Sequence, residues 1–282
     1  MQLLFLDILN AIVFGVVQGI TEWLPISSTG HMILLDQFLA LTSDRAFRDL
    51  FLVVIQFGSI LAVVTLYFHK LNPFSPKKTP SQKRGTWTMW FKVLAGCVPA
   101  AVIGLLFDDL IMSKTYNWYV VAAMLIIYGI LFIIIENRNK APKIKTIDEM
   151  SYKMAALIGI FQVLAMIPGT SRSGATILGA VLIGASRNVA AEFSFFLAVP
   201  VMLGASALEI LKYFMEYGMF SGGQWITLLT GMVTAYIVSI FAIKFLMDYI
   251  RKHDFKVFGY YRIILGVIVI LYFALSHAQI VG

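Results

Sequence analysis

Two polar stretches interrupt the apolar sequence of this 282-residue chain, and both contain residue types that do chemistry. The first polar break, residues 24–31, reads Leu-Pro-Ile-Ser-Ser-Thr-Gly-His and ends at His31. The second polar break, residues 167–174, reads Ile-Pro-Gly-Thr-Ser-Arg-Ser-Gly and carries Arg172. Because an ionisable side chain is costly to keep in an apolar segment, each break is a candidate functional site.

The chemistry that these residues suit is phosphoryl transfer. The guanidinium group of Arg172 presents a planar fork of donors that matches phosphate oxygens and keeps its charge. A serine becomes a nucleophile when a base takes its proton, and His31 is close enough in sequence to the serines of the first break to be that base. Glu22 follows Gln18 by four residues, so both side chains lie on one face of a helix that leads into the first break. Phosphoryl transfer mainly needs positioning and neutralisation of charge, which this set supplies.

The backbone and hydroxyl groups of both breaks are expected to help hold a phosphate. Glycine-containing turns that open helices present free N–H groups, which bind anions. The predicted phosphate-binding residues are Gln18, Ser27, Thr29, Gly30, Ser171, Ser173 and Gly174.

Structural interpretations of the same residues remain open at this point. Glu22 also suits a buried partner of Arg172 or a helix cap, and His31 also suits a hydrogen bond to a carbonyl at the turn. Gln18 and Gln162 also suit a purely structural amide role. Hydroxyl groups commonly cap turns of this kind, which applies to Ser27, Ser28 and Thr29.

The elements that must position these residues are membrane helices. Hydrophobic residues make up 60% of the chain and charged residues 13%, about half the charged share of soluble domains. Six apolar stretches approach or exceed the ~20 residues that cross a bilayer. They cover residues 50–68, 90–107, 118–135, 190–214, 226–247 and 258–275. The sequence therefore predicts one all-α, polytopic integral membrane domain over residues 1–282.

Residues 3–41 and 154–187 are apolar as well, but a polar break divides each of them. The half-segments on both sides of a break look short for a full span. Irregular backbone at membrane depth is tolerated only where protein or a water-filled cavity surrounds it. We predict that both stretches form re-entrant helical hairpins, so that the architecture is six transmembrane helices plus two hairpins.

The basic residues gather in three segments between apolar stretches, whereas residues 108–117 and 216–224 contain one Lys and no Arg. By the positive-inside rule, the three basic segments face the cytoplasm, and this placement explains the net charge of +7 without a nucleic-acid partner. The hairpins then enter from opposite faces, and three spans follow each one. The basic residues are Lys70, Lys77, Lys78, Lys83, Arg84 and Lys92; Arg138, Lys140, Lys143, Lys145 and Lys153; and Arg251, Lys252, Lys256 and Arg262.

An internal repeat fits this topology. Residues 15–34 align without gaps on residues 159–178, with six identities in twenty positions, among them Ser27 with Ser171 and Gly30 with Gly174. Repeat one covers about residues 1–137 and repeat two about residues 150–282. Because an odd number of spans inverts the second repeat, the site is expected near the midplane, where the two breaks meet.

At these residues the sequence resembles the bacterial undecaprenyl-diphosphatase family. The resemblance rests on residues 18–31 (QGITEWLPISSTGH) and 168–174 (PGTSRSG), and it extends over nearly the whole chain, including the Tyr261–Arg262 pair of the last span. The resemblance implies an inner-membrane enzyme that hydrolyses undecaprenyl diphosphate to undecaprenyl phosphate and inorganic phosphate. Such an enzyme recycles the carrier lipid of cell-wall synthesis and confers bacitracin resistance.

The same resemblance implies roles for particular residues. It makes Ser28 the nucleophile, with Ser27 as the other candidate, His31 the acid/base and Arg172 the group that grips the phosphate. Glu22 matches the second acidic position of the first motif, whereas Gln18 stands where many members have Glu. A divalent cation, Mg²⁺ or Ca²⁺, is expected with Glu22 as its ligand, although Gln18 leaves one carboxylate fewer. A homodimer and a site open to the periplasmic side are also implied.

Two alternatives belong to other classes of protein. An inverted repeat with an anion site at the midplane is also how transporters are built, so the chain could carry a polyprenyl phosphate across the bilayer. Pairing of Ser28 with His31 favours chemistry, since binding alone needs no nucleophile. A lipid phosphatase of the acid-phosphatase superfamily would need a second histidine in an apolar segment, and His31 has no such companion.

Overall fold

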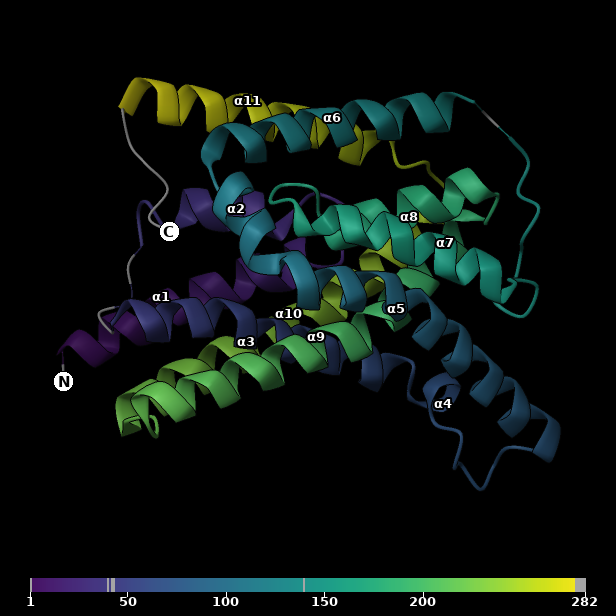
Figure 1. Cartoon of the computed structure of the whole chain (residues 1–282), viewed down its shortest axis with the longest axis horizontal. Helices are drawn as coiled ribbons and strands as arrows, with labels where there is room; N and C mark the ends of the chain where they lie inside the picture. The colour runs from purple at the N-terminus through teal and green to yellow at the C-terminus, as the bar shows by residue number, and fades with distance from the viewer. Residues whose placement is uncertain (1, 40, 42–43, 139, 277–282) are drawn as a thin grey trace.

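The computed structural model describes residues 2–39, 41, 44–138 and 140–276, and within these residues the chain is helical (Figure 1). The described part contains eleven α-helices and one 3₁₀ helix. The only β-bridge in this described part is a parallel one between Ile144 and Ala185. The predicted all-α class is confirmed.

Seven helices of the described chain are long and apolar enough to cross a membrane. Six of them coincide with the predicted spans, which confirms a polytopic membrane protein. The seventh is α1, so the expectation that every half-segment beside a break is short is wrong for α1. The seven are α1 (Gln2–Thr21), α3 (Arg45–Leu66), α5 (Pro80–Thr115), α6 (Trp118–Asn137), α9 (Arg187–Tyr217), α10 (Gly222–Ile250) and α11 (Lys256–Ser276).

The remaining helices are short and flank the polar breaks or the connections. Around the first break α1 precedes α2 (Ser28–Leu35), and around the second break α7 (Tyr152–Val163) and η1 (Leu164–Met166) precede α8 (Arg172–Ile183). One further short helix, α4 (Phe68–Leu71), follows α3. The predicted interruption of both apolar stretches by irregular backbone is therefore confirmed.

Local sequence signals explain where the long helices begin. Thr79 accepts a hydrogen bond from Gln82 N while the Gln82 side chain accepts one from Thr79 N, and Pro80 occupies the first turn of α5. Ser221 and Gln224 form the same capping box at α10. Both arrangements satisfy backbone donors that a helix start leaves unpaired. Side chains of Asp44, Asn117, Ser151 and Ser186 cap α3, α6, α7 and α9.

The helices pack in pairs that cross between the two halves of the chain. Helix α1 packs on α10, α7 packs on α5, α6 packs on α11, and α3 packs on both α10 and α9. Glycines make two of these crossings close. A Cβ atom at Gly15 would lie 2.7 Å from the carbonyl oxygen of Gly231, and Gly159 of α7 faces the backbone of Gly96 in the same way. Small residues allow membrane helices to approach closely, so these contacts fix the packing around the breaks.

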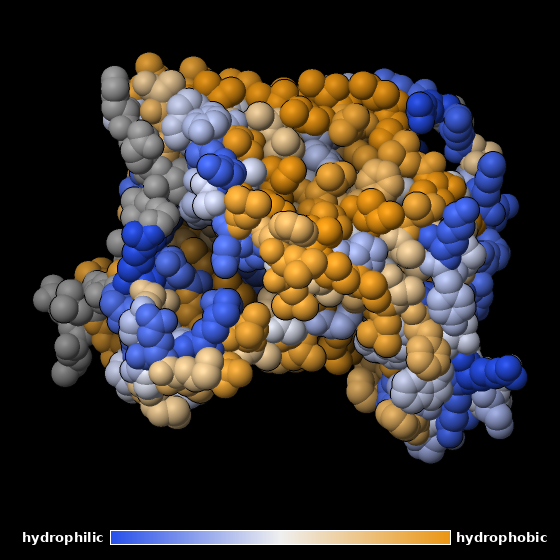
Figure 2. Space-filling model, viewed as in Figure 1, coloured by the Kyte–Doolittle hydropathy of each residue, from blue (hydrophilic) through white to orange (hydrophobic). Residues whose placement is uncertain are grey.

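The outer surface agrees with a membrane environment. Figure 2 shows a face that is apolar across its middle and hydrophilic at its two ends. Many large apolar side chains are exposed, for example Leu105, Phe241 and Ile264. A surface of this kind is expected where lipid is the solvent, since exposed apolar area then carries no penalty.

Two of the basic residues assigned to the segments between apolar stretches are instead buried inside long helices. Lys92 is buried within α5 and donates to the carbonyls of Ile147 and Asp148. Arg262 lies in α11 and is completely buried. Their placement in loops is therefore wrong, because a cation that finds backbone carbonyls to bind can be enclosed by helices.

Candidate active site

The two polar breaks have the same backbone geometry. Ser27 and Ser171 directly precede α2 and α8, and they are the only non-glycine residues of the described chain with positive φ, at 74° and 71°. The hydroxyl of Ser27 accepts from Gly30 N at 3.2 Å, and that of Ser171 accepts from Gly174 N at 3.1 Å. A non-glycine residue in this region is uncommon and clusters at functional sites, because surrounding contacts must hold it there.

Glu22 is the centre of the polar contacts between the breaks. It follows the end of α1 and is buried. One carboxylate oxygen, Oε2, accepts from Gln18 Nε2 at 2.9 Å and from Ser28 Oγ at 3.2 Å. The other, Oε1, forms a salt bridge of 3.2 Å with Arg172. Glu22 therefore connects a reactive hydroxyl of the first break to the cation of the second.

Arg172 stands at the first turn of α8, and its guanidinium group is held from three sides. Besides Glu22 it donates to the carbonyl of Ser194 in α9 at 2.9 Å, and it lies 5.6 Å from the centre of the Trp23 ring. Thr176 and Ser194 share a hydrogen bond of 2.7 Å behind it. These contacts orient the guanidinium toward Glu22, and the cation–π contact adds to the attraction.

Ser173 joins the two breaks through the backbone. Its hydroxyl donates to the carbonyl oxygens of Glu22, at 3.0 Å, and Leu24, at 3.3 Å. The same hydroxyl lies 3.2 Å from the hydroxyl of Ser171. Ser173 is buried, so its role in this arrangement is to hold the turns together. Ser171 and Gly174 complete the cap of α8 beside it.

His31 lies one turn into α2 and is bonded on both sides of its ring. Its Nδ1 is 2.7 Å from the carbonyl oxygen of Ser27, which can only accept, so Nδ1 carries the proton. The other nitrogen, Nε2, is 2.7 Å from the hydroxyl of Tyr261. The two rings are stacked, with centroids 5.6 Å apart. In the neutral imidazole Nε2 then accepts from Tyr261, while the hydroxyl of Ser28 donates to Glu22. Within the described structure Ser28 is therefore hydrogen-bonded to Glu22, rather than to His31 as expected.

Arg262 is the residue that fastens both breaks to the helices around them. It is completely buried, and its partners are backbone carbonyls. It donates to Pro25 O in the first break at 3.3 Å and to Gly169 O and Thr170 O in the second break, both at 2.9 Å. Two further bonds reach the carbonyls of Met124 and Leu125 in α6. One side chain therefore binds carbonyls of three segments.

Of the other predicted residues, Thr29 is half-buried on the first turn of α2, beside Ser28. Gln162, which corresponds to Gln18 in the repeat, is buried in α7, and its amide atoms form no hydrogen bond within the described structure. The structure thus brings Gln18, Glu22, Ser28, Arg172 and Ser173 into one bonded cluster, and it places His31 at its side.

Five residues whose side chains have contacts at the site were not predicted to belong to it: Trp23, Thr176, Ser194, Tyr261 and Arg262. The two residues of α11 had a detectable signal, since an arginine preceded by a tyrosine in a long apolar segment is costly unless both find partners. Ser194 had none, because a serine in an apolar helix commonly bonds only its own backbone.

The expected divalent cation has one carboxylate at the site. Within the residues that the structure describes, no three His, Cys, Asp or Glu side chains come together. Mg²⁺ commonly uses one or two carboxylates and takes its other ligands from substrate phosphates and water. Glu22 would supply the carboxylate and a diphosphate the remaining oxygens. Because Glu22 is bonded to Arg172 and Ser28, no step is assigned to a cation.

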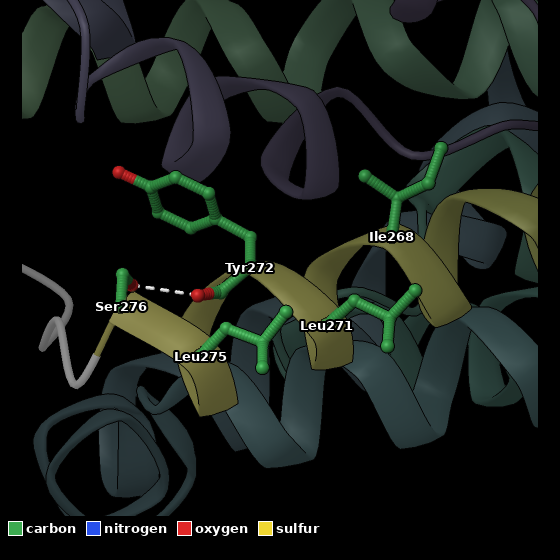
Figure 3. A pocket seen from close by; sticks show the side chains of 5 residues that line it. All are labelled: Ile268, Leu271, Tyr272, Leu275 and Ser276. Carbon is green, nitrogen blue, oxygen red and sulfur yellow. Dashed lines mark hydrogen bonds between the residues drawn. The ribbon is translucent and has the colours of Figure 1, made fainter.

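A hollow of about 460 Å³ on α11 belongs to the outer surface rather than to this site. Figure 3 shows its lining side chains along one face of the helix, with Ser276 Oγ donating to Tyr272 O. The hollow has no charged side chain, so it suits lipid rather than a phosphate. Its residues are Ile268, Leu271, Tyr272, Leu275 and Ser276.

Comparison with known proteins identifies the family. Residues 11–268 match the family model described as bacitracin resistance protein BacA. The chain belongs to this family. It is 58% identical over 276 residues to the undecaprenyl-diphosphatase of Enterococcus faecalis, with 97% of this chain and 100% of the relative covered. It is 58% identical to undecaprenyl-diphosphatase 1 of Clostridioides difficile, covering 96% and 97% of the two chains. The undecaprenyl-diphosphatase of Desulfitobacterium hafniense is 59% identical, with coverage of 95% and 96%. The expected family is therefore confirmed.

Proposed function

We propose that this chain is an integral membrane phosphatase that converts undecaprenyl diphosphate to undecaprenyl phosphate and inorganic phosphate. The observation that carries the proposal is the contact of Ser28 and Arg172 with the same carboxylate, that of Glu22. The hydroxyl, the carboxylate and the guanidinium group thereby lie together, where they would act as nucleophile, base and phosphate-binding group. The relatives named undecaprenyl-diphosphatase supply the substrate, and the reaction would recycle the carrier lipid and confer bacitracin resistance.

In the proposed first step Ser28 attacks the terminal phosphorus of the diphosphate. Glu22 Oε2, 3.2 Å from Ser28 Oγ, takes the hydroxyl proton as the Oγ–P bond forms. The bond between phosphorus and the bridging oxygen breaks, and undecaprenyl phosphate leaves. Arg172 turns from Glu22 to the equatorial oxygens, where negative charge is concentrated. As Glu22 is protonated, its attraction for Arg172 weakens, which frees the guanidinium for the phosphate.

In the proposed second step water attacks the phosphoserine and releases inorganic phosphate. His31 suits this step, because its Nδ1 proton is held by Ser27 O and Nε2 is left as the basic nitrogen. Nε2 accepts from Tyr261 in the resting site, so this hydroxyl turns away as water gives a proton to Nε2. The Oγ–P bond breaks, Ser28 regains its proton from Glu22, and the imidazolium of His31 passes its proton to the departing phosphate. The stacked ring of Tyr261 would hold the imidazole ring in place during this exchange.

We also propose that the chain is an inverted repeat with its site between the halves. Three observations support this. Ser27 and Ser171 have similar backbone angles and the same cap at aligned positions. The packing of α1 of the first repeat on α10 of the second has a counterpart in the packing of α7 of the second repeat on α5 of the first. Each of these crossings also uses an aligned glycine, Gly15 in α1 and Gly159 in α7.

The orientation and the assembly remain part of the proposal. Basic residues on the connections after α3 and α6 place those ends in the cytoplasm by the positive-inside rule. Figure 2 shows the surface hollowed at the end away from the α6–α7 connection, which supports a site that opens to the periplasmic side. A homodimer stays a prediction, tested by the mass of the detergent-solubilised protein.

The test of the proposed reaction is phosphate release by the purified protein in detergent, with undecaprenyl or farnesyl diphosphate as substrate. Wild type should release phosphate, and Ser28→Ala should lower the rate by at least about 10³-fold, since it removes the nucleophile. Ser113→Ala is a matched control, because Ser113 is an exposed serine of α5 that bonds only Leu110 O. Its rate should equal that of wild type.

Two results would contradict the proposal. Release at the wild-type rate by Ser28→Ala would move the nucleophile to Ser27 or to water. A wild type that releases no phosphate, with or without a divalent cation, yet moves a polyprenyl phosphate across vesicles would favour the transporter instead.

A further inference from the structure

A second polar cavity lies at the other end of α8 from Arg172. Its volume is about 600 Å³, and it is formed by the ends of α6, α8 and α10, the start of α9 and the connection after α6. These ends lie together at one side of the molecule in Figure 1. Val181 is the first residue of α8 that lines the cavity, and it follows Arg172 by nine residues, so the cavity begins roughly 13 Å along the helix from Arg172. It is therefore separate from the proposed active site.

The charge of this cavity is strongly positive. Five basic side chains line it, and Glu136 is the one acidic residue of its lining. Glu136 is already neutralised, because Arg187 Nε donates to its Oε1 at 3.0 Å and the backbone N–H of Phe255 donates to the same oxygen at 3.2 Å. Of the four other bases, Arg251 pairs with Asp248 at 3.3 Å, and the remaining three leave a net positive charge for a ligand. The five are Arg138, Lys140, Lys143, Arg187 and Arg251.

The walls of the cavity are fixed by backbone hydrogen bonds. Gly184, which ends α8 with φ of 107°, accepts from Lys143 N at 2.8 Å and Ile144 N at 3.0 Å. Ser186 N donates to Ile144 O at 2.8 Å, and the Ser186 side chain caps α9. The connection that carries Lys140 and Lys143 is thus tied to the α8–α9 turn. A cavity whose walls are already held loses little freedom when it binds a ligand.

Apolar side chains complete the lining, and they indicate what kind of anion binds. Ile135, Val181, Leu182 and Ile250 lie in the last turns of α6, α8 and α10, and Leu182 is exposed. The cavity therefore lies where the hydrocarbon region ends, with bases on one side and apolar groups on the other. A lipid headgroup phosphate with its acyl chains meets both requirements, since basic pockets between membrane helices bind such headgroups.

We propose that this cavity binds the phosphate group of an anionic membrane lipid, at a site distinct from the one that hydrolyses the substrate. Lys140 and Lys143 contact the phosphate, and the apolar ends of α8 and α10 contact the first part of the acyl chains. Arg187 stays with Glu136 and supports the floor of the cavity.

The experiment is a titration of the purified protein in detergent with a short-chain phosphatidylglycerol, read as the shift in melting temperature. The same titration is done with the phosphatidylcholine of equal chain length and with inorganic phosphate. It is repeated in Arg172→Ala, so that binding at the polar breaks is not counted. The test variant is Lys140→Gln with Lys143→Gln. The control is Lys77→Gln with Arg84→Gln, which removes two exposed charges after α4 that do not line the cavity.

We expect phosphatidylglycerol to stabilise wild type, Arg172→Ala and the control alike, and to bind the test variant about 25-fold more weakly, because each interfacial base contributes about fivefold. Equal affinity in the test variant and the control would overturn the site. A phosphatidylcholine shift as large as that of phosphatidylglycerol would overturn the preference for an anionic lipid. A response to inorganic phosphate that needs Lys140 and Lys143 would replace the lipid with a free anion. None of these readings depends on turnover, so the proposed phosphatase reaction stands or fails separately.

Discussion

Replacing Arg262 by methionine is the sharpest test of how the polar breaks are held. Methionine keeps an unbranched side chain of similar length but removes every donor. Five carbonyls then lose their partner: Pro25, Met124, Leu125, Gly169 and Thr170. Because these carbonyls lie in three segments, the change should loosen the breaks relative to each other and to α6.

The magnitude follows from the number of bonds. Hydrogen bonds inside membrane proteins average about 0.6 kcal/mol each, so five of them give about 3 kcal/mol. With ~1.5 kcal/mol for each bond from a charged donor, the loss would be about 7.5 kcal/mol. Removal of a buried cation recovers part of its desolvation cost, so we expect the lower value. Arg262→Lys keeps the charge but reaches fewer carbonyls, and its loss should be intermediate.

The assay combines stability and turnover of the same preparations. Unfolding in detergent micelles measures the free energy, and phosphate release gives kcat and KM. We expect Arg262→Met to lower kcat more than it raises KM, because the displaced breaks misplace Ser28 relative to Arg172. Arg84→Met is the control, since Arg84 is an exposed arginine of α5, and it should change neither quantity. If Arg262→Met unfolds and turns over like wild type, Arg262 does not hold the breaks and the reasoning is refuted.

Three further predictions concern the site itself. Glu22→Gln keeps the shape of the side chain but removes the base and the charge opposite Arg172, so turnover should fall by about 10²–10⁴-fold while the protein loses stability. A wild-type kcat in this variant would contradict the role of Glu22 as the base. Tyr261→Phe keeps the stacking on His31 but removes the hydroxyl on Nε2, so kcat should fall about tenfold with KM within about twofold of wild type; an unchanged kcat and pH profile would show that the hydroxyl has no part in the reaction. Chelation with EDTA should slow phosphate release by wild type, and Mg²⁺ or Ca²⁺ should restore it. Full activity in EDTA would show that the reaction needs no divalent cation. If the cation binds Glu22, the residual activity of Glu22→Gln should no longer depend on the cation.

Much of the fold could be predicted because membrane helices follow from short windows of sequence. The six predicted spans needed only runs of apolar residues, and all six are present. The breaks were detectable because proline, glycine and hydroxyl residues interrupt those runs. The status of α1 was missed, because the polar break at residues 24–31 suggested that residues 3–41 form two short half-segments, whereas α1 alone is a 20-residue helix that ends at Thr21.

The site was predictable in its membership more than in its contacts. Glu22, Ser28 and Arg172 were selected for their residue types, and the structure joins them. The partner of Ser28 was not predictable. His31 is three residues away, and Glu22 six, so sequence distance favoured the histidine. The helical path of α2 carries the imidazole ring back to Ser27 O and across to Tyr261, and it leaves the carboxylate beside the hydroxyl.

By itself the sequence determined that this protein lies in a lipid bilayer, where its membrane spans are, and where its two polar breaks lie. It also determined the residue types that the breaks contain. These are local properties, since hydropathy and turn chemistry depend on neighbours in the chain. The tertiary structure alone decided which groups meet. Glu22 and Arg172 are 150 residues apart, and Arg262 reaches Pro25 across 237 residues. Such contacts depend on how whole helices cross, which glycines at α1–α10 and α5–α7 set by close packing, and no window of sequence contains that information.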